Sequence, residues 1–383
     1  MKKNILFILR DLRFGGIEKS LIEVLNILDY SKYNVELYLR SNDLALLPYL
    51  NKNVRLTVND TSQKESLYVK QLSFVSDALS KLGLKYYSKK AFDFYKRKYA
   101  DSIEKRQKKY FNCEYDVVVC YSQGYTARLV SNIVKAKKKI CFFHESTDQY
   151  HKINSKSFSY FDNIYTVNSK VTDILKQSYP NYSHKFRTGF NYLNFEEVKR
   201  LSEDVVDLPV AKKTLCTVGR FSQEKGFDIA VNCARIAADK GLDFIWLFIG
   251  NGPEFDYVKE LVSDNDLQER IILLGFQSNP YKYMKMADLY VSPSRMEAYP
   301  MTLLESAVLS VPILSTNTEG GINFSNNISE IKLCDIDESS LAEAISDLLS
   351  NDDELERMTN EITNIDWNAY KARFIALWDE ILD

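Results

Sequence analysis

The chain has 383 residues, of which 45% are hydrophobic, and a formal net charge of −2. This length is too great for one ordinary hydrophobic core and suits two α/β domains. The six cysteines never form C-x-x-C, and neither a secretory signal nor a run of about 18 apolar residues occurs, which argues against a disulfide scaffold, a zinc ribbon and a membrane-spanning protein.

Strand and helix patterns alternate along the chain, as two doubly wound sheets require. Apolar runs predict strands at 4–9, 34–40, 54–58, 116–121, 138–144 and 163–168, and a second series begins at 214. Apolar periodicity is lost between 188 and 212, so we expect one Rossmann-like domain over 1–190 and another over 191–365. Residues 366–383 read as an amphipathic helix.

A pair of glycines follows the first predicted strand. Gly15 and Gly16 precede a helix whose apolar residues share one face. Such a pair allows close backbone approach, so an anion can rest on the helix N-terminus, although an ordinary tight turn is an equal alternative. Glu18, in the first turn, is expected to complement the helix dipole rather than to contact substrate.

His144 stands directly at the end of the strand KKICFF. Ligand sites in open α/β sheets lie outside the carboxyl ends of the strands, which makes this histidine a site candidate. A lone histidine at such a place is more often a structural residue, and the pattern alone does not separate the two.

Two cations follow the strand at 214–218. Gly219, Arg220 and Lys225 lie in a polar loop that leads into a helix, and such cations suit a diphosphate, although both could be surface charges. The run FIGNGPE adds Gly250 and Asn251. It lacks the third glycine of G-x-G-x-x-G, because Phe255 stands there, which excludes a nicotinamide dehydrogenase.

Two glutamates, Glu297 and Glu305, flank a predicted strand-to-helix junction after the strand 289–294. Pro300 suits the first helical turn, and the N–H groups at the helix start, those of residues 301–303, would favour a phosphate. One carboxylate could accept from sugar hydroxyls and the other from a ribose. Two solvated surface glutamates are the alternative for this pair taken alone.

In this order, these motifs resemble the nucleotide-binding half of the retaining GT-B glycosyltransferases of family 4. The resemblance implies that Arg220 and Lys225 hold a donor diphosphate, that Glu297 and Glu305 contact the sugar and the ribose, and that Phe276 lies beside the base. It also places the glycine loop and His144 at the donor. The implied catalytic residues are Glu297, His144, Arg220 and Lys225; the implied donor-binding residues are Gly15, Gly16, Gly219, Arg220, Lys225, Gly250, Asn251, Phe276, Met301, Thr302, Leu303 and Glu305.

The same resemblance implies two Rossmann-like domains facing a cleft, a last helix that crosses back onto the N-terminal domain, retention of anomeric configuration and no metal ion or other cofactor. A last helix that only caps the second domain is the alternative. An alternative D-x-D metal motif at Asp335 and Asp337 reads instead as a loop before a helix at 338–350. The family pattern departs at two places: INFSNN follows TNTEGG without the usual Pro-Glu, and the interdomain link reads TGFNYLNF.

The segment 275–307 looks most like bacterial surface-polysaccharide members of that family. This implies transfer of a hexose or N-acetylhexosamine from a nucleoside diphosphate sugar, a UDP-sugar above all, to a lipid-linked or glycan acceptor in capsule or related polysaccharide synthesis. The rivals are a non-catalytic GT-B scaffold subunit and a nucleotide-sugar epimerase on the same fold. The presence of both cations and both glutamates argues for catalysis.

The charge is divided unequally between the two halves. Residues 1–200 hold 35 Lys+Arg and 20 Asp+Glu, a net of +15, whereas residues 201–383 hold 15 and 32, a net of −17. The segment 85–110 has ten basic residues, three acidic ones and seven aromatics, which favours contact with an anionic membrane surface over a solvated hairpin. Nucleic-acid binding finds no motif to support it. We expect a cytoplasmic protein, peripheral on the inner face of the cell membrane.

Overall fold

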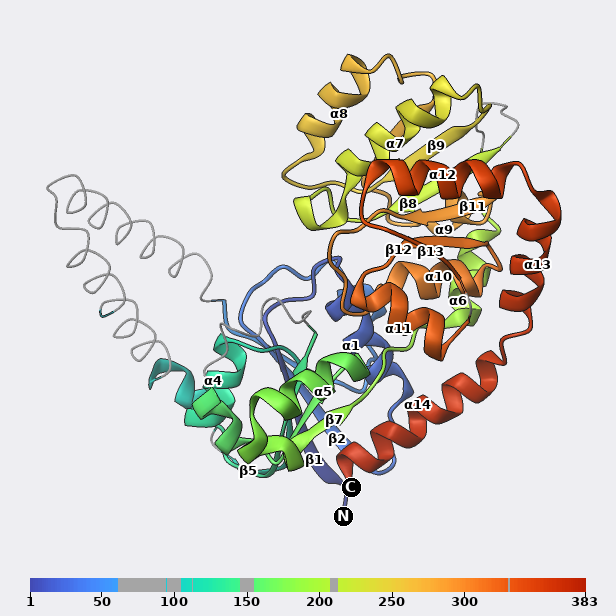
Figure 1. Cartoon of the computed structure of the whole chain (residues 1–383). Helices are drawn as coiled ribbons and strands as arrows, with labels where there is room; N and C mark the ends of the chain where they lie inside the picture. The colour runs from blue at the N-terminus through green and yellow to red at the C-terminus, as the bar shows by residue number, and fades with distance from the viewer. Residues whose placement is uncertain (61–93, 95–104, 112, 145–154, 207–212, 330) are drawn as a thin grey trace, which may run out of the picture.

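The computed structural model describes residues 1–60, 94, 105–111, 113–144, 155–206, 213–329 and 331–383. It contains two parallel sheets with helices on both faces, so the expected α/β architecture of two Rossmann-like units is confirmed (Figure 1). Most of the segment 85–110 lies outside the described residues, and the predicted membrane contact with it.

The first sheet has seven strands in the order β3-β2-β1-β4-β5-β6-β7, and the second has six in the order β10-β9-β8-β11-β12-β13. The first consists of β1 (Lys3–Leu9), β2 (Tyr33–Leu39), β3 (Arg55–Val58), β4 (Tyr115–Cys120), β5 (Ala136–Phe143), β6 (Asn163–Thr166) and β7 (Phe186–Thr188). The second consists of β8 (Thr214–Val218), β9 (Ile245–Ile249), β10 (Ile271–Gly275), β11 (Leu289–Ser292), β12 (Ile313–Thr316) and β13 (Lys332–Cys334).

Helices connect the strands within the described parts of the chain. They are α1 (Gly16–Ile27), α4 (Tyr125–Asn132), α5 (Ser169–Ser178), α6 (Phe195–Ser202), α7 (Phe227–Asp239), α8 (Phe255–Asp264), α9 (Tyr281–Met284), α10 (Met301–Val308), α11 (Glu319–Asn327), α12 (Glu338–Leu349), α13 (Asp352–Thr363) and α14 (Trp367–Leu382). Asp337 caps α12 by accepting from the Ser340 N–H at 2.8 Å, as a loop before a helix requires.

The strand order reverses beside β1 in the first sheet and beside β8 in the second. In both sheets the first strand in the chain lies between the second and the fourth, which is the topological switch point where open α/β sheets bind ligands. The loops after β1, β8 and β11 leave the sheets at these points. The topology therefore brings the predicted glycine, cation and glutamate motifs to one place.

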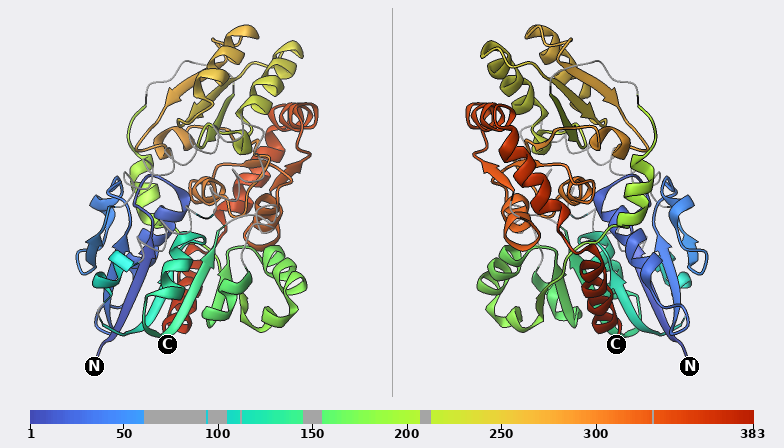
Figure 2. Two further views of the ribbon diagram at one scale, coloured as in Figure 1. Left: turned by 90° about the vertical axis from the view of Figure 1, so that its left-hand side faces the viewer. Right: turned by 90° about the vertical axis from the view of Figure 1, so that its right-hand side faces the viewer.

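The last helix, α14, returns to the first sheet (Figure 1 and Figure 2). The Trp378 ring stacks on Phe142 at a centroid distance of 5.3 Å and lies 5.8 Å from Phe7. Lys138 Nζ donates to the Ile381 carbonyl at 2.9 Å, and Lys3 pairs with Asp383 at 3.1 Å. The expected return of the C-terminal helix to the N-terminal domain is confirmed.

The interdomain link contains a helix that the sequence analysis did not single out. In the described part of 188–212, α6 begins after the cap residue Asn194 and buries Phe195 and Val198. Two buried apolar side chains in one short helix are too few for a periodic signal.

Pro300 differs from its predicted place, because it takes the N-cap position of α10 and Met301 is the first helical residue.

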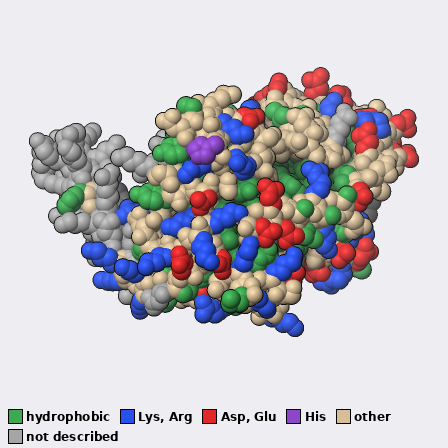
Figure 3. Space-filling model, turned by 90° about the horizontal axis from the view of Figure 1, so that it is seen from below, with side chains coloured by type: hydrophobic (Ala, Val, Ile, Leu, Met, Phe, Trp, Pro, Cys, Tyr) green, Lys and Arg blue, Asp and Glu red, His purple; other side chains and the backbone are tan. Residues whose placement is uncertain are grey.

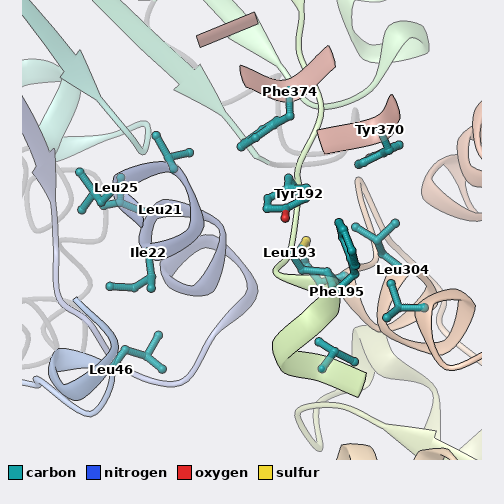
Figure 4. Close-up of a cluster of buried hydrophobic side chains, with 14 of the residues drawn as sticks. Leu21, Ile22, Leu25, Leu46, Tyr192, Leu193, Phe195, Leu304, Tyr370 and Phe374 are labelled. Atoms are coloured by element: carbon teal, nitrogen blue, oxygen red, sulfur yellow. The ribbon is translucent and has the colours of Figure 1, made fainter. Parts of the chain in front are cut away.

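A continuous apolar cluster joins the link to both domains (Figure 4). Leu21 and Leu25 from α1, Tyr192 from the link, Leu304 from α10 and Phe374 from α14 belong to it. The Tyr192 and Phe374 rings stack at 5.2 Å. Burial of this surface holds the two sheets with their carboxyl ends facing each other.

Replacing Trp378 by Ala tests the return helix. The change removes a buried ring that contacts the first sheet, so we expect the free energy of unfolding to fall by about 3–5 kcal/mol. Denaturant unfolding monitored by circular dichroism measures it. Ile375, on the same helix and 36% exposed, is the matched position, and its replacement by Ala is expected to cost under about 1 kcal/mol. Equal losses of stability in the two variants would contradict the packing of Trp378 against the first sheet.

Candidate functional site

A cleft of about 630 Å³ lies between the two domains. Its walls are the loop after β1 with the start of α1, the loops after β8, β9 and β10, and the junction between β11 and α10. The cleft is lined by Gly15, Gly16, His144, Gly219, Arg220, Lys225, Gly250, Asn251, Phe276, Glu297, Met301, Thr302 and Glu305. The structure thus brings together every predicted site residue except Leu303.

Leu303 is the one predicted donor-binding residue that does not line the cleft. Its side chain is fully buried, and its N–H donates to the Pro300 carbonyl at 3.2 Å. This hydrogen bond closes the first turn of α10, in which Pro300 takes the N-cap position. Met301 and Thr302 are the residues through which the first turn of α10 reaches the cleft, where N–H groups lack intrahelical partners.

Lys225 and Glu297 form an ion pair across the two loops that follow β8 and β11. Glu297 Oε1 also accepts from Ser294 Oγ at 3.2 Å. Arg220 is exposed on the same wall. The pair fixes one carboxylate and one ammonium group side by side, with a long guanidinium side chain nearby, so a phosphorylated ligand would meet both cations.

Two glycines allow the loops of this wall to pack closely. Gly226 has φ +67°, and a Cβ there would lie 2.1 Å from the Pro293 carbonyl oxygen. Gly250 has φ +141°, and a Cβ there would lie 1.8 Å from the carbonyl oxygen of Gly219. Side chains at these positions would push the Lys225 loop and the Asn251 loop off the sheet edge.

The Glu297 loop is held from the far side by the start of α11. The Gly320 N–H donates to the Glu297 carbonyl at 2.8 Å, and a Cβ on Gly320 would lie 2.6 Å from Pro300 Cδ. From the other domain, Asn168 Nδ2 donates to the carbonyls of Ala298 and Glu319 at 3.0 and 3.2 Å. The run TNTEGG therefore supports this loop through its glycines. It does so although INFSNN follows it in place of the usual Pro-Glu.

His144 follows β5 directly and lines the cleft from the N-terminal domain. Its Nε2 is buried and has no hydrogen-bond partner among the described residues. Its ring lies 4.9 Å from that of Tyr121, and burial lowers the pKa of His144 from 6.5 to about 4. The imidazole is therefore neutral near pH 7, with one nitrogen available to a ligand hydroxyl.

Glu305 is buried and engaged by two residues that the sequence analysis did not single out. Its Oε1 accepts from Lys19 Nζ at 2.9 Å and from the Tyr281 hydroxyl at 3.2 Å. Burial alone would lower the pKa of Lys19, but the Glu305 carboxylate and Tyr281 raise it well above its usual value. Lys19 comes directly after Glu18, and Tyr281 follows Pro280, yet neither local sequence indicates a contact with Glu305.

Glu18 does more than complement the helix dipole. Its carboxylate is buried against Gly15, where a Cβ would lie 2.2 Å from Glu18 Oε2. Burial raises the pKa of Glu18 to about 7, while its own backbone N–H and Arg13, at 3.5 Å, act in the opposite direction. Gly15 therefore makes room for a carboxylate of this chain at the start of α1.

Phe276 is 52% exposed on the rim of the cleft. Its ring lies 5.1 Å from that of Phe14, which comes from the glycine loop of the other domain. A flat ring at the rim offers a stacking surface for another flat ring.

Within the described residues, no group of three or more His, Cys, Asp and Glu side chains is arranged to hold a metal ion.

Replacing Gly226 by Ala tests the packing of the cation loop. We expect a loss of stability clearly above the roughly 1–2 kcal/mol of a positive-φ alanine, because the new Cβ would also meet the Pro293 carbonyl. Gly241 is the matched control, since it has φ +79° and a Cβ there would meet nothing within 4 Å. Thermal unfolding of both variants measures the difference, and equal losses would contradict the close approach.

Replacing His144 by Gln tests the neutral imidazole. The folded state holds the pKa of His144 near 4, below its ordinary 6.5, so the unfolded chain takes up the proton first and wild-type stability falls as pH drops from about 6.5 to 4. Between pH 7 and pH 5, we expect the free energy of unfolding of the variant to fall by about 1–2 kcal/mol less than that of wild type. Denaturant unfolding at pH 7 and 5 measures it, and parallel losses would refute the assignment.

Sequence comparisons find a family match in the second half of the chain. The model of the family "Glycosyl transferases group 1" matches residues 199–364. The 2-deoxystreptamine N-acetyl-D-glucosaminyltransferase of Niallia circulans is 32% identical over 146 residues, covering 37% of this chain and 38% of that protein. A Campylobacter jejuni diphospho-undecaprenol 4-alpha-N-acetylgalactosaminyltransferase is 27% identical over 34% of this chain and 35% of its own length. Each alignment thus spans little more than a third of the curated relative.

Solved structures match the whole chain at low identity. A glycosyltransferase from Rickettsia africae has a TM-score of 0.67 at 18% identity, covering 100% of this chain and 99% of that one. Anabaena Alr3699/HepE in complex with UDP has a TM-score of 0.66 at 13% identity, covering 99% and 100%. These likenesses concern the fold. The segment 199–364 thus matches the family of glycosyl transferases group 1, within a chain that has the GT-B fold.

Proposed function

We propose that this protein is a retaining glycosyltransferase that uses a nucleoside diphosphate sugar, with UDP as the nucleotide. The observation that carries the proposal is the convergence of Arg220, Lys225, Glu297 and Glu305 on one interdomain cleft. Two cations, two carboxylates and the start of α10 supply groups for a diphosphate, a sugar and a ribose. The group 1 family match over 199–364 supports the same assignment.

The donor would lie along the cleft in a defined direction. Phe276 offers a stacking surface to the base, and Glu305, which lines the same cleft, would bind the ribose. Arg220 and Lys225 would hold the diphosphate beside the first turn of α10. The glycine loop at the start of α1 faces them from the other domain.

The sugar would lie between the two domains, beside Glu297 and His144. Glu297 accepts from Lys225 and Ser294, so it is held as an acceptor with a fixed orientation. The neutral His144 presents the buried Nε2 to the same cleft. These two side chains would bind sugar hydroxyls and orient the anomeric carbon.

In the reaction, the bond from the anomeric carbon to the β-phosphate oxygen breaks and a bond to the acceptor oxygen forms. The acceptor hydroxyl proton passes to the departing diphosphate. Negative charge grows on that diphosphate, and preorganised cations there are typically worth about 3–4 kcal/mol of barrier each. We propose attack from the same face, with retention of configuration and without a metal ion, and NMR of the product anomer and an EDTA control test these two points.

The acceptor proposal follows from the relatives. One relative acts on a diphospho-undecaprenol acceptor by its name, and another is an Escherichia coli O-antigen biosynthesis glycosyltransferase. We therefore propose a lipid-linked or glycan acceptor in bacterial surface-polysaccharide synthesis. No helix within the described ranges is long and apolar enough to cross a membrane.

Contact with the inner face of the cell membrane is part of the proposal and rests on the segment 85–110. Figure 3 shows the face that carries the two chain termini, where Lys and Arg side chains are interspersed with Asp and Glu. Lys137 pairs with Asp116 at 2.7 Å, and Lys3 with Asp383 at 3.1 Å. Basic side chains that are already paired attract an anionic surface weakly, so this face is not the proposed contact.

Calorimetric titration of UDP, GDP and ADP tests the donor site. We expect selective binding of UDP, lost in Glu305→Ala with the fold intact by circular dichroism. Arg220→Ala is expected to lower kcat with a UDP-sugar by about 10²–10³-fold. Arg235→Ala is the matched control, because Arg235 pairs with Asp239 on the surface of α7, away from the cleft.

Two other results would redirect the assignment. Folded wild type that binds none of the three nucleotides would refute the donor site and favour a scaffold subunit. Binding of a UDP-sugar followed by its conversion into an epimer, without transfer to an acceptor, would favour the epimerase.

A further inference from the structure

The Glu305 carboxylate has one satisfied oxygen and one free oxygen. Oε1 accepts from two donors, Lys19 Nζ at 2.9 Å and the Tyr281 hydroxyl at 3.2 Å. Oε2 is buried and has no hydrogen-bond partner within the described part of the chain. A carboxylate oxygen has about two acceptor sites, so Oε1 is full and Oε2 is open.

Lys19 and Glu305 come from different domains. Lys19 lies on α1 beside the glycine loop, and Glu305 lies on α10 in the second domain. Both side chains line the cleft, and the Glu305 side chain is only 3% exposed. A carboxylate this deeply buried stays ionised only if a cation compensates for its lost hydration.

We propose that Lys19 keeps Glu305 ionised and oriented, so that the free oxygen accepts from the ribose hydroxyls only while the two domains are closed. This inference rests on the proposed function for the identity of the ligand. Lys19 is a positioning residue in this scheme, because it acts through Glu305. Nucleotide recognition is then coupled to the interdomain geometry.

Removal of Lys19 has a specific chemical consequence. Without the ammonium group, the buried carboxyl of Glu305 takes a proton at pH values where it is otherwise ionised, and a protonated carboxyl is a poorer acceptor for two hydroxyls. The other ionisable groups that face the pair are Tyr281 on α9, Tyr290 on β11 and Glu23 on α1. Burial raises the pKa of Glu23 to about 7, so the test needs a variant that isolates Glu305.

The first arm of the test uses no nucleotide. Thermal unfolding midpoints are measured from pH 5 to 8 for wild type, Lys19→Met, Lys19→Arg and the double variant Lys19→Met/Glu305→Gln. In Lys19→Met the folded state holds a proton on Glu305 that the unfolded chain releases, so its stability relative to wild type is expected to fall as pH rises. The double variant is expected to lose this pH dependence, and Lys19→Arg to resemble wild type.

The second arm compares the affinities for UDP and 2′,3′-dideoxy-UDP at pH 6 and pH 8. Wild type is expected to prefer UDP by about tenfold or more at both pH values, as a charge-assisted hydrogen bond provides. Lys19→Met is expected to show a smaller preference, most reduced at pH 6. Lys213→Met, which removes a lysine that pairs with Asp352 at 2.6 Å outside the cleft, is expected to keep the wild-type preference.

The outcomes separate the two proposals. A Lys19→Met variant that follows wild type in both arms overturns the inference while leaving the proposed function intact. A wild type that binds no UDP refutes the proposed donor and the ribose role together, and the first arm then still decides whether Lys19 controls the ionisation of Glu305.

Discussion

The apolar cluster that joins α1, the interdomain link, α10 and α14 is the interaction on which the cleft depends. The site residues come from two domains, and neither sheet alone presents all of them. Burial of rings such as Tyr192 and Phe374 is non-directional, so it fixes the separation of the domains without specifying chemistry. Polar contacts such as that from Asn168 to the Ala298 carbonyl then set the register between the two walls.

Much of the architecture follows from short sequence signals. The strands after which Gly15, Gly219 and Glu297 stand are mostly apolar, because parallel strands in this fold are covered on both faces. The position of the ligand cleft follows from strand order, because the chain switches sides between β3 and β4 and between β10 and β11, whereas other sequential strands are neighbours. The resemblance to the GT-B family implied that residues scattered over the whole chain share one site, and the strand order accounts for their meeting.

The parts that could not be predicted depend on contacts between elements far apart in sequence. Lys19 and Glu305 are separated by 286 positions, and nothing in either local pattern indicates their pairing. Leu303 does not line the cleft, because its side chain is buried and its N–H donates to the Pro300 carbonyl in the first turn of α10. Helix α6 escapes prediction because it is short, and most of its stability comes from packing against α9 and α10.

The contact between β1 and α14 has a consequence for how the chain acquires its structure during synthesis. β1 lies in the centre of the first sheet, and its Phe7 packs against Trp378. The ribosome makes β1 before the second sheet and α14 after it, so the part of the first sheet that Trp378 covers waits for the entire second domain. All seven strands of the earlier sheet are therefore made long before the last helix that packs on them.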